Sequence, residues 1–127
     1  MKVVLALLAL VLAGCSTAEP ASTGPVTVDV WLMRDSTTDD FTARFKEDFE
    51  KTHTRIRLNI QIQEWDGIGP KVISALASND APDVIEVGNT QVAQYVASMG
   101  VTDLSGKKAE LQGDDWIPGL SEPGAVD

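Results

Sequence analysis

Apolar and polar residues alternate along two segments of the chain, which predicts two β-strands. In VTVDVWLM (26–33), one face carries the apolar residues Val26, Val28, Val30 and Leu32. In IRLNIQIQ (56–63), the inward positions are Ile56, Leu58, Ile60 and Ile62. A period of two is that of a strand with one face buried. A third, shorter apolar run, from Asp83 to Val87, predicts a third strand.

Helical patterns follow each of these segments. In FTARFKEDFEKTH, Phe recurs every four residues at Phe41, Phe45 and Phe49, which predicts a helix whose aromatic face packs in the core. The second helix carries its apolar residues at Ile68, Val72, Ile73 and Leu76, and Pro70 suits its first turn. A third helix is expected from about Thr90 to Met99, with Gly100 as its C-terminal cap.

Strands that alternate with helices predict an α/β fold with a parallel sheet and right-handed crossovers. In open sheets of this kind, ligands bind at the carboxyl ends of the strands. Three polar turns stand at those ends, and we expect them to line one shared mouth. The candidate ligand-binding residues in these turns are Asp35, Ser36, Trp65, Asp66, Glu86, Asn89 and Thr90.

A structural explanation competes with ligand binding for several of these residues. Ser36, Asp66 and Thr90 each stand where a helix N-cap is wanted, and capping alone would account for them. Before the first helix, Thr37 is a second possible cap beside Ser36. Glu86 could be a solvated strand end. Trp65 is harder to explain structurally, because a tryptophan in a loop at a strand end is well suited to stack on a ligand.

The amino-terminal residues predict export and lipidation. MKVVLALLALVLAGC holds an apolar run of Val3 to Ala13, too short for a bilayer span of about 20 residues and typical of a secretory signal. Leu12-Ala13-Gly14-Cys15 resembles the lipobox of bacterial lipoproteins, which implies that Cys15 receives the lipid. We therefore predict a signal peptide at 1–14, a lipidated Cys and flexible tether at 15–25, and a globular part at 26–127.

Charge and composition narrow the possible partners. The formal net charge of −9 argues against nucleic acid and against a basic patch on anionic lipid. One Cys and one His allow no internal disulfide, no cysteine-based zinc site and no histidine metal cluster. We expect no cofactor.

The chain resembles the extracellular solute-binding proteins of bacterial carbohydrate ABC transporters, the group that includes maltose-binding protein. Besides the lipobox and tether, the resemblance rests on VTVDVWLM with its Phe-rich helix, on IRLNIQIQEW and, most specifically, on ISALASNDAPDVIEVGNTQVAQYVASMGVTDL. It implies an incomplete N-terminal lobe of the periplasmic-binding-protein type, lipid-anchored on the extracellular face of the cell membrane. It also implies capture of a sugar without catalysis and delivery to membrane permease subunits.

By this resemblance the family's binding turns fall on the three polar turns found above. Asp35 would accept hydrogen bonds from sugar hydroxyls, Asn89 would both donate and accept, and Trp65 would stack on a ring. Arg34 would brace Asp35. Family members have two lobes and several hundred residues, so we expect this sequence to be a fragment or a truncated form.

Two other classes of function stay open from the sequence. Asp35, Asp66 and Glu86 could sit near one another, and two of them would then supply the paired carboxylates that a glycosidase uses. A surface lipoprotein with a structural or adhesive role is the other alternative. The identity of the sugar is also open among chito-, malto- and xylo-oligosaccharides.

Overall fold

The computed structural model describes residues 24–125. Its regular elements are β1 Val26–Met33, α1 Asp39–Thr52, β2 Ile56–Gln63, α2 Ile68–Leu76, β3 Val84–Ile85, α3 Val92–Ala97 and α4 Pro118–Ser121. The predicted signal peptide, the lipidated Cys15 and most of the tether lie outside the described residues.

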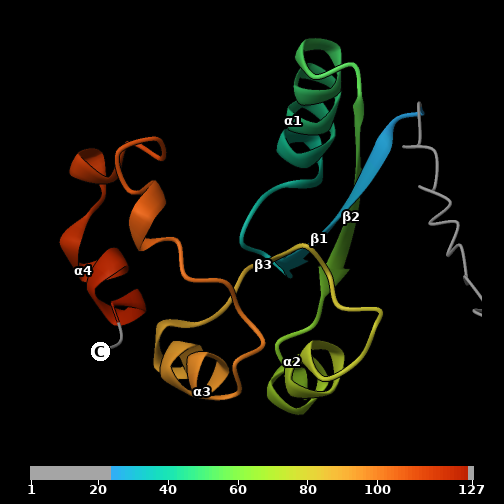
Figure 1. Ribbon diagram of the computed structural model, residues 1–127. Helices are drawn as coiled ribbons and strands as arrows, with labels where there is room; N and C mark the ends of the chain where they lie inside the picture. The colour runs from blue at the N-terminus through green and yellow to red at the C-terminus, as the bar shows by residue number, and fades with distance from the viewer. Residues whose placement is uncertain (1–23, 126–127) are drawn as a thin grey trace, which may run out of the picture.

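The three strands form one parallel sheet in the order β2-β1-β3, so the α/β fold predicted from the sequence is confirmed (Figure 1). The long pair β1 and β2 runs in register from Val26 beside Ile56 to Met33 beside Gln63. By contrast, β3 pairs with the centre of β1 over only two positions. Because the strands are parallel, their carboxyl ends lie at one edge of the sheet, where α2 begins and α3 follows β3.

The core lies on the face of β1 that carries Trp31 and Met33. These side chains pack with α2 and α3, where Val72 is fully buried and Tyr95 is 2% exposed. Figure 1 shows α2 and α3 side by side below the sheet. The Val and Ile positions of the opposite face are mostly only partly buried, Leu58 being the buried exception. Among residues 24–125, two helices cover the face of Trp31 and Met33, and α1 alone lies beside the other face. The deeper core therefore forms on the face of β1 that is less regularly apolar.

The aromatic face of α1 is exposed rather than buried, so the prediction that it packs in the core is wrong for the described residues. Phe41 is 54% and Phe45 is 48% exposed, and no residue of α1 is buried. The rings stack along the helix instead, with centroids 6.3 Å apart for Phe41 and Phe45 and 5.9 Å apart for Phe45 and Phe49. The described residues supply no layer on that side of the helix, and ring-on-ring contact replaces part of the missing burial.

The chain after α3 is a series of short helical turns that ends with α4 and a 3₁₀ turn at Glu122–Gly124. Met99, and not Gly100, takes the left-handed conformation after α3, with φ 55°. Gly100 has a different role, because a Cβ at this position would lie 2.6 Å from Cβ of Leu76 in α2. Within residues 24–125, the helices are too short or too polar to cross a bilayer.

Candidate functional site

The three polar turns meet at the carboxyl edge of the sheet. The indole Nε1–H of Trp65, after β2, donates a hydrogen bond to the carbonyl oxygen of Arg34, after β1, at 3.0 Å. A Cβ on Gly88, after β3, would lie 3.9 Å from the six-membered ring of Trp65. The indole is therefore in contact with both neighbouring turns, and the segment that leads into Asn89 lies on the same side of the molecule.

An ion pair joins the turn after β1 to the turn after β2. Arg34 donates from Nε and from one terminal nitrogen to Oε1 of Glu64, at 3.0 and 2.9 Å. The carboxylate of Glu64 raises the pKa of Arg34 through this hydrogen bond and its charge. Both side chains are about half exposed, and exposed pairs contribute little to stability, so the effect of this pair is to fix the turns relative to each other. Arg34 therefore makes its hydrogen bonds to Glu64, whereas the sequence predicted that it braces Asp35.

A second carboxylate joins the turn after β1 to the end of β3. Oε2 of Glu86 accepts from the N–H of Met33 at 2.8 Å, and Oε1 accepts from Oγ of Ser36 at 2.5 Å. The turn at 34–36 is thus held from both sides, by Glu64 and Trp65 on one and by Glu86 on the other. Inside it, Asp35 has a φ of 67°, in the left-handed region that non-glycine residues rarely occupy.

Helix capping does not explain the polar residues of the three turns. The N-cap of α1 is Thr38, whose Oγ1 accepts from the N–H of Phe41 at 3.2 Å. Gly67 occupies the N-cap of α2, and Gly88 occupies that of the 3₁₀ turn Asn89–Gln91 that precedes α3. Ser36, Asp66 and Thr90 are therefore not N-caps. The structural alternative offered for these three residues is wrong.

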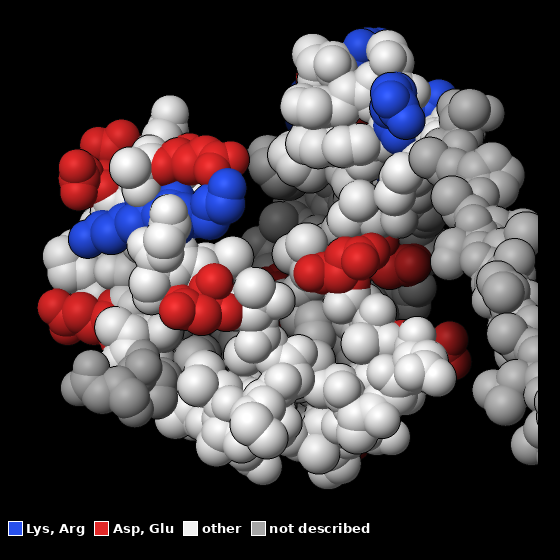
Figure 2. Space-filling model, in the orientation of Figure 1, with Lys and Arg blue, Asp and Glu red and all other residues white. Residues whose placement is uncertain are grey.

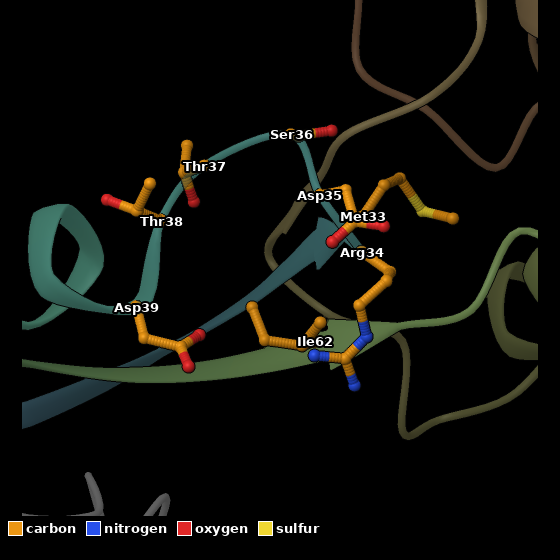
Figure 3. Close-up of a pocket in the computed structure, with 8 residues that line it drawn as sticks. All are labelled: Met33, Arg34, Asp35, Ser36, Thr37, Thr38, Asp39 and Ile62. Carbon is orange, nitrogen blue, oxygen red and sulfur yellow. The ribbon is translucent and has the colours of Figure 1, made fainter.

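An open hollow of about 370 Å³ lies beside the turn after β1 (Figure 3). The loop from Arg34 to Asp39 forms one wall and Ile62 of β2 lies beneath it. Its volume falls within the range of about 300–1,000 Å³ that is usual for small-molecule sites. Of the predicted site residues, Asp35 and Ser36 line this hollow. The others lie outside its lining, on the remaining two turns: Trp65, Asp66, Glu86, Asn89 and Thr90.

The three turns, 34–36, 64–66 and 86–90, together form a rim at the carboxyl edge of the sheet. Comparison with known protein families identifies the kind of protein that carries this rim. A model of the family described as bacterial extracellular solute-binding protein matches residues 34–125. The chain belongs to this family. The match begins at the turn after β1 and includes the residues of all three turns, so the rim lies within the region of the chain that matches the family.

Two curated relatives from Streptomyces align with most of the chain. The diacetylchitobiose binding protein DasA of Streptomyces coelicolor is 40% identical over 101 residues, which is 80% of this chain and 23% of that protein. An uncharacterized lipoprotein of Streptomyces antibioticus is 31% identical over 105 residues, again 80% of this chain and 23% of the relative. The chain thus spans about a quarter of the length of the relatives that it matches.

Several polar side chains of this solute-binding protein are left free at the rim. Among residues 24–125, the side chains of Asp35, Asp66, Asn89 and Thr90 make no hydrogen bond, and all four are exposed. Polar groups of this kind are available to a ligand without the loss of an internal contact. By contrast, Arg34 and Glu64 are hydrogen bonded to each other, and Glu86 accepts hydrogen bonds from the turn after β1.

The indole of Trp65 combines exposure with a fixed position. Its side chain is 51% exposed, although its N–H is hydrogen bonded and its ring approaches Gly88. Holding an aromatic ring in place before a ligand arrives lowers the entropic cost of binding. Gly88 leaves the ring free of any side chain at that position.

Sequence reasoning missed two of the links that organise the rim, the Arg34–Glu64 pair and the approach of Gly88 to Trp65. The signal for the first was available, because Met33 and Gln63 end β1 and β2 in register and the next residues carry opposite charges. The approach of Gly88 needed the relative position of β2 and β3, which are not adjacent in the sheet.

In the view of Figure 2, a patch of acidic side chains lies near the middle of the molecule, below α1. Basic side chains lie over α1 and, with acidic side chains on either side of them, over the segment after α3. This distribution, with the net charge of −9, favours a neutral polar ligand over an anionic one at the rim.

Proposed function

We propose that this solute-binding protein captures an extracellular sugar for a bacterial ABC transporter. The observation that carries the proposal is the half-exposed indole of Trp65, fixed at the meeting point of three turns. A flat aromatic face beside hydroxyl, amide and carboxylate groups suits a sugar ring, which has apolar C–H faces and polar edges. The 40% identity to a diacetylchitobiose binding protein supports the same class of ligand.

Each exposed polar residue of the rim has a role in this proposal. Asp35 accepts hydrogen bonds from sugar hydroxyls, and these bonds are strong because the acceptor is charged. Asn89 both donates and accepts, which suits a pair of neighbouring hydroxyls. Asp66 and Thr90 supply further contacts around the ring that stacks on Trp65, whereas the hydroxyl of Ser36 bonds to Glu86 beside Asp35.

Diacetylchitobiose is the first sugar to test, because the relative's name supplies it. The acetamido group of each N-acetylglucosamine unit offers one N–H donor and one carbonyl acceptor. Asp35 can accept from such an N–H, and the amide of Asn89 can pair with such a carbonyl. Neither of these hydrogen bonds requires a charge on the ligand. An uncharged sugar is also not repelled by the acidic surface of the protein.

The proposal extends to location and partners. Cys15 carries the lipid that holds the protein on the extracellular face of the membrane, and residues 16–25, which reach at most about 35 Å, form the tether. A lipoprotein relative supports this anchor. The loaded protein then delivers its sugar to permease subunits of the transporter, without chemical change of the ligand.

Thermal unfolding with added sugar tests the proposal. Diacetylchitobiose at about 100 times its Kd raises the free energy of unfolding by about 2.7 kcal/mol. Trp65→Ala is expected to weaken binding about fivefold to tenfold, because the sugar would bury the exposed half of the ring and full burial of a large apolar side chain is worth roughly 1.5–3 kcal/mol. Trp116→Ala is the matched control, because Trp116 is 42% exposed, donates from its indole to Leu111 and stands outside the three turns. It should bind like the unmodified chain.

Three results would contradict the proposal. Equal loss of binding in the Trp65 and Trp116 variants would place the sugar elsewhere. Release of reducing ends from chito-oligosaccharides would indicate a glycosidase. No stabilisation by chito-, malto- or xylo-oligosaccharides would favour a structural or adhesive lipoprotein.

A further inference from the structure

The carboxylate of Glu86 takes the place of a main-chain carbonyl in the sheet. β3 consists of Val84–Ile85, and the N–H of Glu86 donates to the carbonyl of Trp31 at 2.9 Å. In a continuing parallel ladder, the N–H of Met33 would donate to the main-chain carbonyl of Glu86. It donates to side-chain Oε2 of Glu86 instead, at 2.8 Å. The main chain therefore leaves the sheet at Glu86 while its side chain keeps the last N–H of β1 satisfied.

At the other end of β3, a side-chain carboxylate again accepts from a strand N–H in place of a main-chain carbonyl. The N–H of Asp29 donates to Oδ2 of Asp83 at 2.8 Å, and the N–H of Asp83 donates to the carbonyl of Asp29 at 2.9 Å. The sequence Asp-Val-Ile-Glu is thus a two-residue strand whose flanking carboxylates extend its contact with β1. Hydrogen bonds to an ionised acceptor are stronger than those between neutral groups.

Glu86 differs from Asp83 because its second oxygen reaches the rim. Oε1 accepts from Oγ of Ser36 at 2.5 Å, so a single carboxylate binds Met33 and Ser36, the two residues that flank Arg34 and Asp35. A left-handed conformation such as that of Asp35 persists only where its surroundings hold it. The two bonds of Glu86 close the turn around that residue.

We propose that Glu86 is a positioning residue of the sugar site, one that shapes the turn presenting Asp35 and does not contact the ligand. This replaces the expectation from the sequence that Glu86 itself binds the sugar. Both oxygens of Glu86 already accept hydrogen bonds, whereas the carboxylate of Asp35 accepts none among the described residues. The inference rests on the proposed function for the ligand, and on the hydrogen bonds alone for the shape of the turn.

Two substitutions of Glu86 separate positioning from direct contact when diacetylchitobiose is the probe. Glu86→Gln keeps an oxygen that can accept from Met33 and an N–H₂ group that can donate to Ser36, so its Kd should stay within about threefold of the unmodified chain. Glu86→Ala loses both bonds, and its Kd should rise about tenfold or more. Equal weakening by Gln and Ala would mean that the sugar needs the charge itself, and would overturn the proposal.

Ser36→Ala provides a second variant should Glu86→Ala fail to fold. It removes one of the two bonds and should raise Kd about threefold. Added to Glu86→Ala it should cost no further affinity, because its partner is already gone. Additive losses would mean that Ser36 and Glu86 act independently, against the proposal. Glu47→Ala is the matched control, since Glu47 pairs with Lys51 on the exposed side of α1, and its affinity should be unchanged.

Hydrogen exchange at the amide of Met33 tests the positioning without any ligand. Exchange should be about tenfold or more faster in Glu86→Ala than in the unmodified chain, and nearly unchanged in Glu86→Gln. Unchanged exchange in Glu86→Ala would overturn the positioning role whatever the affinities show. If the exchange pattern is as expected but the unmodified chain binds no chito-, malto- or xylo-oligosaccharide, the proposed function is contradicted and the role of Glu86 in the turn stands.

Discussion

At the scale of single residues, the rim divides into side chains that hold the turns and side chains that are free. Glu64, Glu86 and the indole N–H of Trp65 are bonded to the turn after β1. Asp35 and Asn89 are exposed and make no side-chain hydrogen bond within residues 24–125. A position in the sequence indicates that a residue reaches the rim, but it does not indicate which of the two groups the residue joins.

Asp35→Gly separates the conformation of this residue from its chemistry. Glycine takes a φ of 67° without the steric cost that a side chain meets, so the free energy of unfolding should stay equal or rise by up to about 1 kcal/mol. Affinity for diacetylchitobiose should fall about tenfold, because a charge-assisted hydrogen bond is lost. Chemical denaturation and calorimetric titration of the same sample measure both quantities.

A loss of stability together with the loss of affinity would show that the carboxylate of Asp35 holds the turn rather than the ligand. Asp35→Asn is the companion variant. Asparagine also tolerates the left-handed region, so any loss of affinity in it reports the charge alone.

At the scale of elements, the period of the apolar residues predicted β1 and β2 with the bounds that the structure shows, and it placed a helix after each strand. Cap positions were less accurate. The sequence placed the cap of α1 at Ser36 or Thr37, whereas Thr38 makes the bond, because Ser, Thr and Asp fill the whole approach to the helix and local pattern cannot rank them. The exposure of the Phe face depended on neighbouring layers, which local pattern does not describe.

Acidic side chains also complete the sheet at its outer edge. Oε1 of Glu50 in α1 accepts from the N–H of Leu58 at 2.8 Å, on the side of β2 where the described residues place no further strand. A blocked edge is less able to pair with another chain. With Asp83 and Glu86, this is the third carboxylate that satisfies a strand N–H, and no motif in the sequence indicated any of them.

Thr38→Ala tests the observed start of α1. Removal of an N-cap hydroxyl costs about 0.5–2 kcal/mol, so the free energy of unfolding should fall by about that amount. Thr54→Ala is the control, because Thr54 lies in the exposed turn between α1 and β2 and should change stability by less than about 0.5 kcal/mol. A larger loss from Thr37→Ala than from Thr38→Ala would return the cap to the position that the sequence suggested.

At the scale of the whole molecule, the described residues build one well-covered face of a parallel sheet and leave the other only partly covered. Tyr95 lies at the centre of the covered face, 2% exposed, with its hydroxyl donating to Oε1 of Gln91 at 3.0 Å. Burial raises the pKa of Tyr95, because the charged phenolate would be poorly solvated there.

The raised pKa of Tyr95 predicts a loss of stability in alkali. The folded state holds the phenolic proton more tightly than the unfolded state, whose pKa is about 10. The contribution is therefore complete below about pH 10 and is lost as the pH rises through the pKa of the folded state. Denaturation from pH 8 to 11 should show this decline, and Tyr95→Phe should reduce it. An equal decline in both forms would assign the effect to other groups.

The chain has three tryptophans, and their indole N–H resonances in a ¹H–¹⁵N NMR spectrum report directly on the central claim. Titration with diacetylchitobiose should move the indole resonance of Trp65 and leave that of Trp31, which is 8% exposed beneath the sheet, nearly unchanged. A shift of Trp31 or Trp116 with Trp65 unmoved, or no indole shift at millimolar sugar, would contradict a sugar site where the three turns meet.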